Sequence, residues 1–366
     1  DNLDTTNTLD SITVSDCTLD PVFSSATTEY SCKVPNSVSS VTVNAKASST
    51  KAKVRGLGTK DLTVGKNTLP IRVIAEDGSE KIYNINITRK VGVSSLKNEI
   101  MKNSVITANP TLTTSSNNTS DASGLYASTD TNTGKPTYYF RGNVENNYVS
   151  FAEFTWRIVR INEDGTIRIV MQDGINNNTN YKFNSNYNNY TYMYYTNNSN
   201  AKTQLESWYQ TNIGSKSDSA KNIASGNYYC EQAKVKWSDS DTSGSATMTT
   251  YNKYTPDFKC SSDGNGKGVV NASVGLLTYD EVVYAGGYII QSNNNYYLYN
   301  NTNFWTMSPR GFTNPYSCVW IGFRTGEIYI AHVNYDTSYL RPVINLTVNT
   351  QISDGSGTKE NPFVVE

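Results

Sequence analysis

The chain has 366 residues, a formal net charge of −1, 17% charged residues and 37% hydrophobic residues, and its length suits roughly two or three domains. The near-neutral charge argues against a nucleic-acid binder held by phosphate electrostatics, and no apolar run reaches the roughly 18 residues of a membrane-spanning helix. A single histidine, His332, argues against histidine metal sites and histidine acid–base chemistry. Neutral polar residues are abundant instead, with 45 Asn and 27 Tyr, which indicates a folded β-rich chain with a polar surface.

Residues 1–91 alternate between apolar and polar positions, as half-buried strands do. The alternating segments are SVTVNAKA, KAKVRGLG, LPIRVIAEDG and KIYNINITR, and turn sequences such as Asp77-Gly78 separate them. A period of two with short spacing predicts an Ig-like antiparallel β-sandwich.

Several segments of this region resemble, in order and spacing, the cadherin-like β-sandwich repeat of bacterial surface proteins. They are Leu19, Pro21, Phe23 and Tyr30, then VRGLG (Val54–Gly58), LTVGKNTLPIRVIAEDG (Leu62–Gly78) and YNINITR (Tyr83–Arg89). The resemblance covers about residues 8–90. It implies a spacer domain in a secreted or wall-attached protein, with no activity of its own. The acidic linker motifs of true cadherins are missing from the sequence, so the resemblance does not extend to calcium.

Residues 92–124 are predicted to be a linker with a candidate short helix. TANPTLTTSSNNTSDASG has turn and loop chemistry and little to bury. In SLKNEIMKNSVI, Leu96 and Ile100 lie one helical turn apart. The aromatic residues also mark a boundary, because only Tyr30 and Tyr83 of the 27 Tyr, and none of the five Trp, precede residue 100.

Residues 125–366 begin with a predicted hairpin. WRIVRI and TIRIVM alternate on either side of Asp164-Gly165. Two helices are predicted next, in Ala201–Ile213 and Leu277–Gly287. The second has Thr278 as N-cap, Glu281 at the capping-box position and paired glycines at its end.

The end of the sequence contains short segments rich in aromatic and β-branched residues, which are typical of strands. They are FWTMSPRG, SCVWIGF, EIYIAHV and YLRPVINLTV. Trp305 and Trp320 lie in the first two of these and are predicted to belong to the core.

Taken together, the motifs YYFRG, VENNYV, WRIVRIN, GLLTYDEVVYAGG, FWTMSPRG and LRPVINL are similar to a domain common in surface proteins of Firmicutes. That domain has a C-type-lectin-like fold. It is distantly related to the formylglycine-generating enzyme and to proteins diversified by retroelements. The resemblance implies an α+β domain over residues 125–366, with a mixed twisted sheet and two helices that support long irregular loops. In such domains the loops bind ligands.

The five cysteines indicate in which cellular compartment the protein is found. Their positions favour the disulfides Cys17–Cys32 and Cys230–Cys260, with Cys318 unpaired. The alternative is that all five are reduced and serve as small core residues. Disulfides favour an oxidising, extracellular compartment, and the two resemblances imply the bacterial cell surface. A sequence that starts at Asp1 without Met is consistent with removal of a signal peptide.

We expect neither an enzyme nor a cofactor, because no catalytic constellation is recognisable. The oxygenase branch of the related fold needs two cysteines near the C-terminal strands, and only Cys318 lies there. The sequence has no GxSxG, HExxH or P-loop motif, and His332 is expected to be a packed strand residue. No metal site is expected either, because SSDGNGKG (Ser261–Gly268) and DTNTGKP (Asp130–Pro136) lack the carboxylates of a calcium loop and suit plain turns.

Asn and Tyr concentrate in Ile175–Asn200 and Gln291–Phe304. Tyr provides rigid amphipathic area and Asn provides adaptable hydrogen bonds, a mixture typical of paratopes. We therefore predict ligand-binding loops. The candidates in the first segment are Tyr187, Tyr190 and Tyr192. Diversified relatives vary in their C-terminal region, so the resemblance adds Arg310, Phe312, Tyr316, Arg324, Tyr335 and Tyr339.

These features favour a non-enzymatic adhesin or ligand-binding protein whose partner is a protein or a glycan. In the alternative, the chain is a self-assembling subunit of a surface fibre, pilus or layer, and the same loops contact other copies. Polar loops without a binding role are also compatible with the composition.

Overall fold

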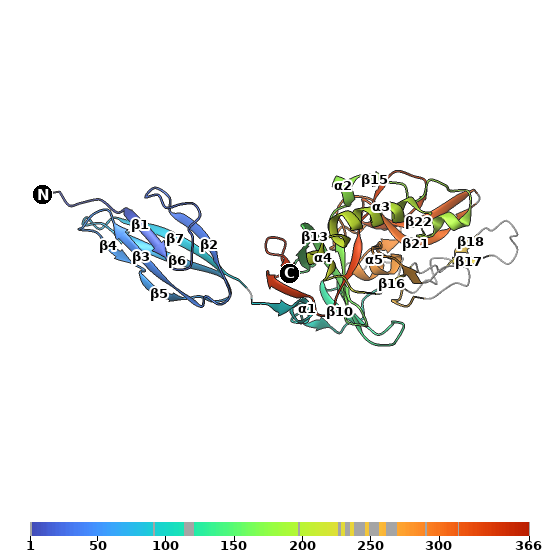
Figure 1. Ribbon diagram of the computed structural model, residues 1–366, viewed down its shortest axis with the longest axis horizontal. Helices are drawn as coiled ribbons and strands as arrows, with labels where there is room; N and C mark the ends of the chain where they lie inside the picture. Colours follow the sequence, from blue (N-terminus) through green and yellow to red (C-terminus); the bar gives the residue numbers. More distant parts are fainter. Residues whose placement is uncertain are drawn as a thin grey trace. The chain divides into compact units, whose positions relative to one another are not determined.

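The computed structural model describes residues 2–90, 92–112, 121–196, 198–225, 228–230, 235–237, 246–248, 256–260, 269–289, 291–313 and 315–365. The chain forms two compact units (Figure 1). The first is Asp1–Ser94 with Ser353–Gly355, and the second is Ser95–Ile352 with Ser356–Glu366. The first is a β-sandwich, and the second combines sheets with a few helices.

The sandwich has two sheets, as the alternating sequence predicts. Their strand orders are β1–β3–β5 and β2–β7–β6–β4. The strands are β1 (Leu9–Val14), β2 (Glu29–Val34), β3 (Ser40–Ala47), β4 (Lys53–Arg55), β5 (Gly58–Asp61), β6 (Gly65–Ile74) and β7 (Glu80–Arg89). Neighbouring strands are antiparallel except β2 and β7, which run parallel and so depart from the predicted antiparallel pattern.

Aliphatic side chains and two tyrosines fill the sandwich. Tyr30 and Tyr83 are fully buried, and their hydroxyls donate to the carbonyls of Ser24 at 2.7 Å and Ser25 at 2.8 Å. A buried tyrosine needs such a partner for its hydroxyl. The predicted disulfide Cys17–Cys32 is present and ties the chain after β1 to β2.

The second unit has two main sheets. The larger contains the path β26–β27–β12–β13–β11–β10–β9, and β14 joins β13 to β25. The smaller has the order β15–β24–β21–β22–β23–β20, and β16–β19 and β17–β18 form two short pairs.

The strand bounds are β8 (Ser94–Ser95), β9 (Val105–Ile106), β10 (Gly124–Ser128), β11 (Thr137–Arg141), β12 (Tyr148–Phe151), β13 (Phe154–Ile161), β14 (Ile167–Met171), β15 (Asn180–Tyr181), β16 (Tyr228–Cys230), β17 (Val235–Trp237), β18 (Ala246–Met248), β19 (Val269–Asn271), β20 (Tyr288–Ile289), β21 (Phe304–Thr313), β22 (Tyr316–Gly322), β23 (Glu327–His332), β24 (Ser338–Tyr339), β25 (Val343–Leu346), β26 (Gln351–Asp354) and β27 (Phe363–Val365).

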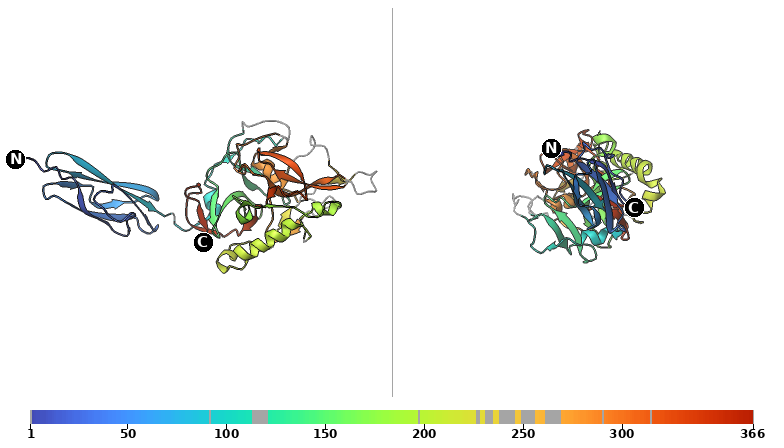
Figure 2. Two further views of the ribbon diagram at one scale, coloured as in Figure 1. Left: turned by 90° about the horizontal axis from the view of Figure 1, so that it is seen from above. Right: turned by 90° about the vertical axis from the view of Figure 1, so that its left-hand side faces the viewer.

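Both predicted helices are present. The helical segments are α1 (Leu96–Ile100), α2 (Ile175–Asn178), η1 (Tyr190–Met193), α3 (Asn200–Tyr209), η2 (Gln210–Gly214), α4 (Ser217–Ala220) and α5 (Tyr279–Ala285). The first predicted helix is α3 with η2, yellow-green along the outside of the unit in Figure 2. The second is α5, in which Thr278 and Glu281 form the predicted capping box and Gly286 ends the helix with φ of +122°. Within the described ranges, no helix has both the length and the apolar character needed to cross a membrane.

Part of the region expected to be a linker belongs to the second unit. The predicted helix α1 forms, and Leu96 and Ile100 are buried in that unit's core. β9 then pairs in parallel with β10. The prediction was wrong for residues 95–106 because two apolar side chains one turn apart are enough to anchor the segment. Residues 113–120 lie outside the described residues.

The two Asn/Tyr-rich segments are also less exposed than predicted. Several of their large side chains belong to the core of the second unit: Phe183, Met193, Tyr194, Tyr195, Tyr296, Tyr297 and Leu298. Tyrosine rings bury a large apolar area, so a Tyr-rich segment can pack as well as bind. Trp305 and Trp320 are buried, as predicted.

Candidate functional site

Four aromatic side chains stack in a row at one side of the smaller sheet, and we call Tyr187, Tyr316, His332 and Tyr335 the aromatic ladder. The ring centroids are 5.4 Å apart between Tyr187 and Tyr316, 4.3 Å between Tyr316 and His332, and 4.7 Å between His332 and Tyr335. The first two pairs are nearly parallel, with interplanar angles of 17° and 16°. These separations are favourable for stacked rings.

Antiparallel pairing of β22 with β23 brings two of the rings together. The register pairs Cys318 with His332, so Tyr316 at the start of β22 lies beside the end of β23. Tyr335 follows in a turn, where its backbone N–H donates to the carbonyl of His332 at 3.0 Å.

The fourth ring comes from the first Asn/Tyr-rich segment, which is fastened to β22. The backbone N–H of Ser317 donates to the carbonyl of Tyr187 at 2.9 Å. The Ser317 hydroxyl donates to the carbonyl of Asn189 at 2.5 Å. Ser317 is fully buried, so these two hydrogen bonds hold the backbone at Tyr187 against β22.

The three tyrosines of the ladder are exposed. Tyr187 is 36% exposed, Tyr316 is 38% and Tyr335 is 48%. Tyr187, Tyr316 and His332 cover one another's ring faces by stacking, so a ligand can reach only the part of each tyrosine that stays exposed. Because stacking already restricts the side-chain torsions, binding here costs less conformational entropy than binding to isolated tyrosines.

His332 is the ladder residue that the sequence reasoning did not include among the binding residues. Burial lowers the pKa of its imidazole below the ordinary value of 6.5, so the ring is mostly neutral at physiological pH. The turn at Thr325-Gly326 could have predicted its position, because pairing of the strands on either side of this turn brings His332 opposite Cys318.

The other predicted binding residues do not join the ladder. Phe312 is only 5% exposed and packs in the core, so its prediction as a binding residue is wrong. Tyr190 and Tyr192 are half-buried and pack against the same core. Arg324 is exposed, with its guanidinium 5.7 Å from the ring centre of Phe323.

The remaining two predicted binding residues are Arg310 and Tyr339. Both are half-buried. Tyr339 is paired with Asn180 between β24 and β15, and Arg310 lies near enough to the buried thiol of Cys318 to affect its pKa.

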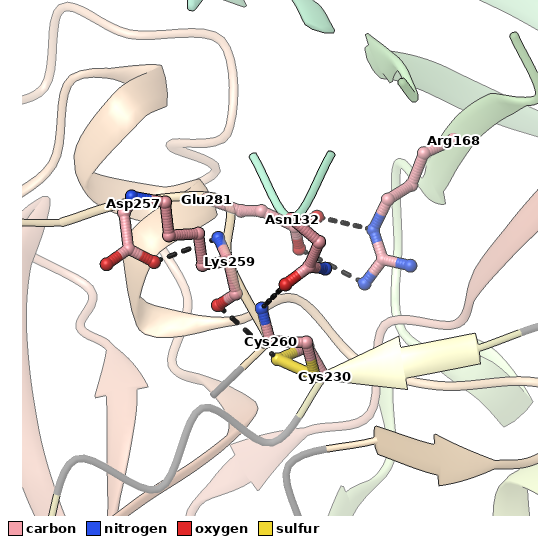
Figure 3. Close-up of a disulfide and its surroundings, with 7 residues drawn as sticks. All are labelled: Asn132, Arg168, Cys230, Asp257, Lys259, Cys260 and Glu281. Carbon is pink, nitrogen blue, oxygen red and sulfur yellow. Dashed lines mark hydrogen bonds and ion pairs between the residues drawn. A yellow bond between two sulfur atoms is a disulfide. The ribbon is translucent and has the colours of Figure 1, made fainter. Parts of the chain in front are cut away.

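A cavity of about 340 Å³ lies beside the second predicted disulfide, Cys230–Cys260. Figure 3 shows this disulfide with the side chains around it. The wall of the cavity includes Arg160, Arg168 and Glu281. The Glu281 carboxylate lies 2.5 Å from Nε of Arg168 and 3.3 Å from Nε of Arg160. It also accepts the backbone N–H of Thr278 at 3.0 Å.

Glu281 is therefore held as an ionised structural group. Burial opposes its ionisation, but the charges of Arg168 and Arg160 and the bond from Thr278 outweigh that effect and lower the pKa. A carboxylate with its oxygens engaged by two guanidinium groups and a backbone amide is a poor proton carrier. This cluster fixes the start of α5.

Several sequence motifs of the second unit contain an arginine that is buried in the structure. Arg141, Arg157, Arg168 and Arg341 are each at most 4% exposed. Arg141 donates to the carbonyls of Val283 and Tyr284 in the last turn of α5, at 2.8 and 3.0 Å. Arg341 donates to the carbonyl of Leu298 at 2.8 Å. The arginines of the motifs YYFRG and LRPVINL thus form buried hydrogen bonds that stabilise the end of α5 and the loop at Leu298.

In the part of the chain that is described, no three His, Cys, Asp or Glu side chains form a group suited to a metal ion. The segment Asp130–Pro136 is a turn in which Asp130 pairs with Lys259. The other turn considered for calcium, Ser261–Gly268, lies outside the described residues.

Comparison with known proteins identifies the first unit alone. Residues 9–90 match the family described as a cadherin-like beta sandwich domain, in agreement with the two-sheet architecture observed there. No curated protein and no solved structure gave a significant match to the chain.

Proposed function

We propose that the chain is an extracellular bacterial surface protein of adhesin type that binds its partner through the aromatic ladder of the second unit. The cadherin-like domain then serves as a spacer. The observation that supports this most is the stack of Tyr187, Tyr316, His332 and Tyr335, with three exposed tyrosines in fixed positions. Tyrosine is one of the residue types, with tryptophan and arginine, that most often anchor an interface.

Two further features support the proposal. The disulfides Cys17–Cys32 and Cys230–Cys260 suit an oxidising extracellular compartment. The second unit has sheets, two main helices and long connecting segments, as expected for the C-type-lectin-like fold that we propose for it. Such a fold presents its binding residues on irregular segments, as the Tyr187 segment does here.

The chemistry of the ladder indicates the kind of partner. Ring edges and phenol hydroxyls offer apolar area together with hydrogen bonds, and the imidazole is mostly neutral at physiological pH. Such a surface suits a neutral protein face or a glycan better than a highly charged polymer.

The test is a binding screen with the whole chain on arrays of glycans and of extracellular proteins. Tyr316→Ala removes the centre of the ladder, and Tyr329→Ala is the matched control. Tyr329 is 43% exposed on the neighbouring strand β23 and packs on Phe323, outside the ladder. We expect hits that Tyr316→Ala loses and Tyr329→Ala retains. Absence of any hit for the wild type, or equal loss in both variants, contradicts the proposal.

The same samples separate binding of another molecule from self-assembly. If the chain is a subunit of a fibre, pilus or layer, sedimentation velocity will show concentration-dependent polymers of the wild type that Tyr316→Ala abolishes. A wild type that stays monomeric while it binds array targets supports the adhesin.

A further inference from the structure

His332 is the ladder residue whose charge can change near neutral pH, and it is the only histidine of the chain. Its imidazole lies between the rings of Tyr316 and Tyr335, with ring centroids 4.3 and 4.7 Å away. Both tyrosines are exposed, and His332 itself is half-buried. A partner that rests on both tyrosines therefore crosses the edge of the imidazole between them.

Within the described residues, no charged group compensates a proton on this imidazole. Burial is the only cause that lowers the pKa of His332, so neither Asp336 nor Arg310 contributes to the shift. The titratable groups on the segments packed around His332 are Tyr187 in the first Asn/Tyr-rich segment, Tyr190 and Tyr192 on η1, Arg310 on β21, Tyr316 and Cys318 on β22, and Tyr335 and Asp336 in the turn after β23.

The imidazole also lacks an acceptor for a second proton. Its Nδ1 atom is buried and has no hydrogen-bond partner among the described residues. The imidazolium carries a proton on both ring nitrogens, so the N–H at Nδ1 would stay unpaired. A buried donor without an acceptor is costly, and more so when it is charged. The neutral imidazole avoids that larger cost.

Stacking does not reverse this preference when a partner binds. Cation–π attraction to Tyr316 and Tyr335 favours the imidazolium, but both rings flank His332 in the free and in the bound chain, so this attraction is common to the two states. Binding adds a further loss of water at the imidazole edge, which penalises the charged form. A neutral partner has no carboxylate to offset that penalty.

We propose that His332 makes binding at the ladder depend on pH, with a neutral partner held while the imidazole is neutral and released when it gains a proton. This inference rests on the proposed function, because it needs a partner at the ladder. Above the pKa of His332 in the free chain, pH has no effect through this group. Below it, the proton must leave before the partner binds, so affinity falls by up to about tenfold per pH unit until the lower pKa of the complex is reached.

The first measurement needs no partner. Because the chain has one histidine, isotope-labelled histidine gives a single imidazole signal in the NMR spectrum of the full chain, and its titration gives the pKa of His332. We expect this pKa to be below the ordinary value of 6.5. A pKa at or above 6.5 would overturn the proposal whether or not a partner is found.

The second measurement is the dissociation constant of a target from the arrays at pH 7.5 and at pH 5.0. For the wild type we expect it to rise roughly three- to tenfold at the lower pH. His332→Phe keeps a ring in the stack but cannot gain a proton, so its constant should change by no more than about twofold. Tyr329→Ala, the matched control, keeps His332 and should follow the wild type.

The results separate the two proposals. Equal constants for Tyr316→Ala and Tyr329→Ala at pH 7.5 contradict the ladder as the binding surface. Where the ladder is confirmed at pH 7.5, the role of His332 alone is overturned by an unchanged wild-type constant at pH 5.0, or by the same pH dependence in His332→Phe. Tighter binding at pH 5.0 also overturns it, because a carboxylate of the partner would then pair with the imidazolium.

A last measurement does not depend on how well His332→Phe folds. The NMR titration of the wild type is repeated with the target bound, and we expect a lower pKa for His332 than in the free chain. An equal or higher pKa in the complex would overturn the proposal.

Discussion

Tyrosine side chains divide into buried and exposed groups in the second unit. The hydroxyl of Tyr195 donates to the carbonyl of Val274 at 2.9 Å inside the core, whereas Tyr187 and Tyr316 stack at the surface. Tyr195 and Tyr187 come from the same Asn/Tyr-rich segment, Ile175–Asn200, so composition alone does not separate buried from exposed rings. Contacts with residues distant in the sequence decide which ring is buried.

The thiol of Cys318 is expected to be unreactive in the folded protein. Burial raises its pKa to about 11, against the opposing charge of Arg310. At pH 8 only about one thiol in a thousand is then ionised, and the thiolate is the reactive form. Iodoacetamide should leave the native chain unmodified and alkylate one cysteine per chain in denaturant, as read by mass spectrometry. Rapid labelling of the native protein would show instead that the thiol is accessible and ionised.

At the scale of single elements, the start of α5 depends on the cluster of Glu281, Arg160 and Arg168. Glu281→Gln leaves two guanidinium groups without their shared counter-charge, so we expect a loss of about 3 kcal/mol in the free energy of unfolding. Denaturant titration of the second unit measures it. The control is Asp130→Asn, which removes the exposed pair with Lys259 and should cost less than about 1 kcal/mol. Equal losses would mean that the buried cluster contributes no more than a surface pair.

The same variant gives a pH test. The pKa of Glu281 is lower in the folded protein than its ordinary value of 4.5. The ionised cluster therefore adds stability above that pH, and this contribution falls as the pH drops below about 4.5. The Glu281→Gln variant should lose this part of the pH dependence. Parallel stability curves for wild type and variant between pH 3 and 7 would contradict the assignment.

Elements defined by neighbouring residues could be predicted from the sequence, whereas the pairing of strands that are distant in the sequence could not. The turn at Asp164-Gly165, the capping box at Thr278 and the alternating strands of the sandwich are local patterns, and each is present. The parallel pairing of β9 with β10 and of β12 with β27 depends on distant segments. The ladder also depends on contacts between distant segments. The sequence therefore could not separate its members Tyr187, Tyr316 and Tyr335 from Phe312, which is buried.

At the scale of the whole molecule, the two units are chemically different and can be followed separately. All five Trp lie in the second unit. The sandwich of the first unit is instead closed by Cys17–Cys32, a disulfide that spans 15 positions. Tryptophan fluorescence therefore reports on the second unit, while far-UV circular dichroism reports on both.

Removing that disulfide should affect the first unit alone. In the chain-entropy account, a loop of this length contributes about 3 kcal/mol. We expect Cys17→Ala/Cys32→Ala to shift a transition seen by circular dichroism to lower denaturant, with the fluorescence transition unchanged. A common shift of both signals would show that the units unfold as one.

If the aromatic ladder is the binding surface, a ladder variant and a matched control must differ in their dissociation constants. For a target found on the arrays, we predict that Tyr316→Ala raises the dissociation constant roughly 30-fold, as expected for a central tyrosine anchor. Tyr329→Ala should change it by no more than about twofold. Equal dissociation constants for the two variants would show that the ladder is not the binding surface.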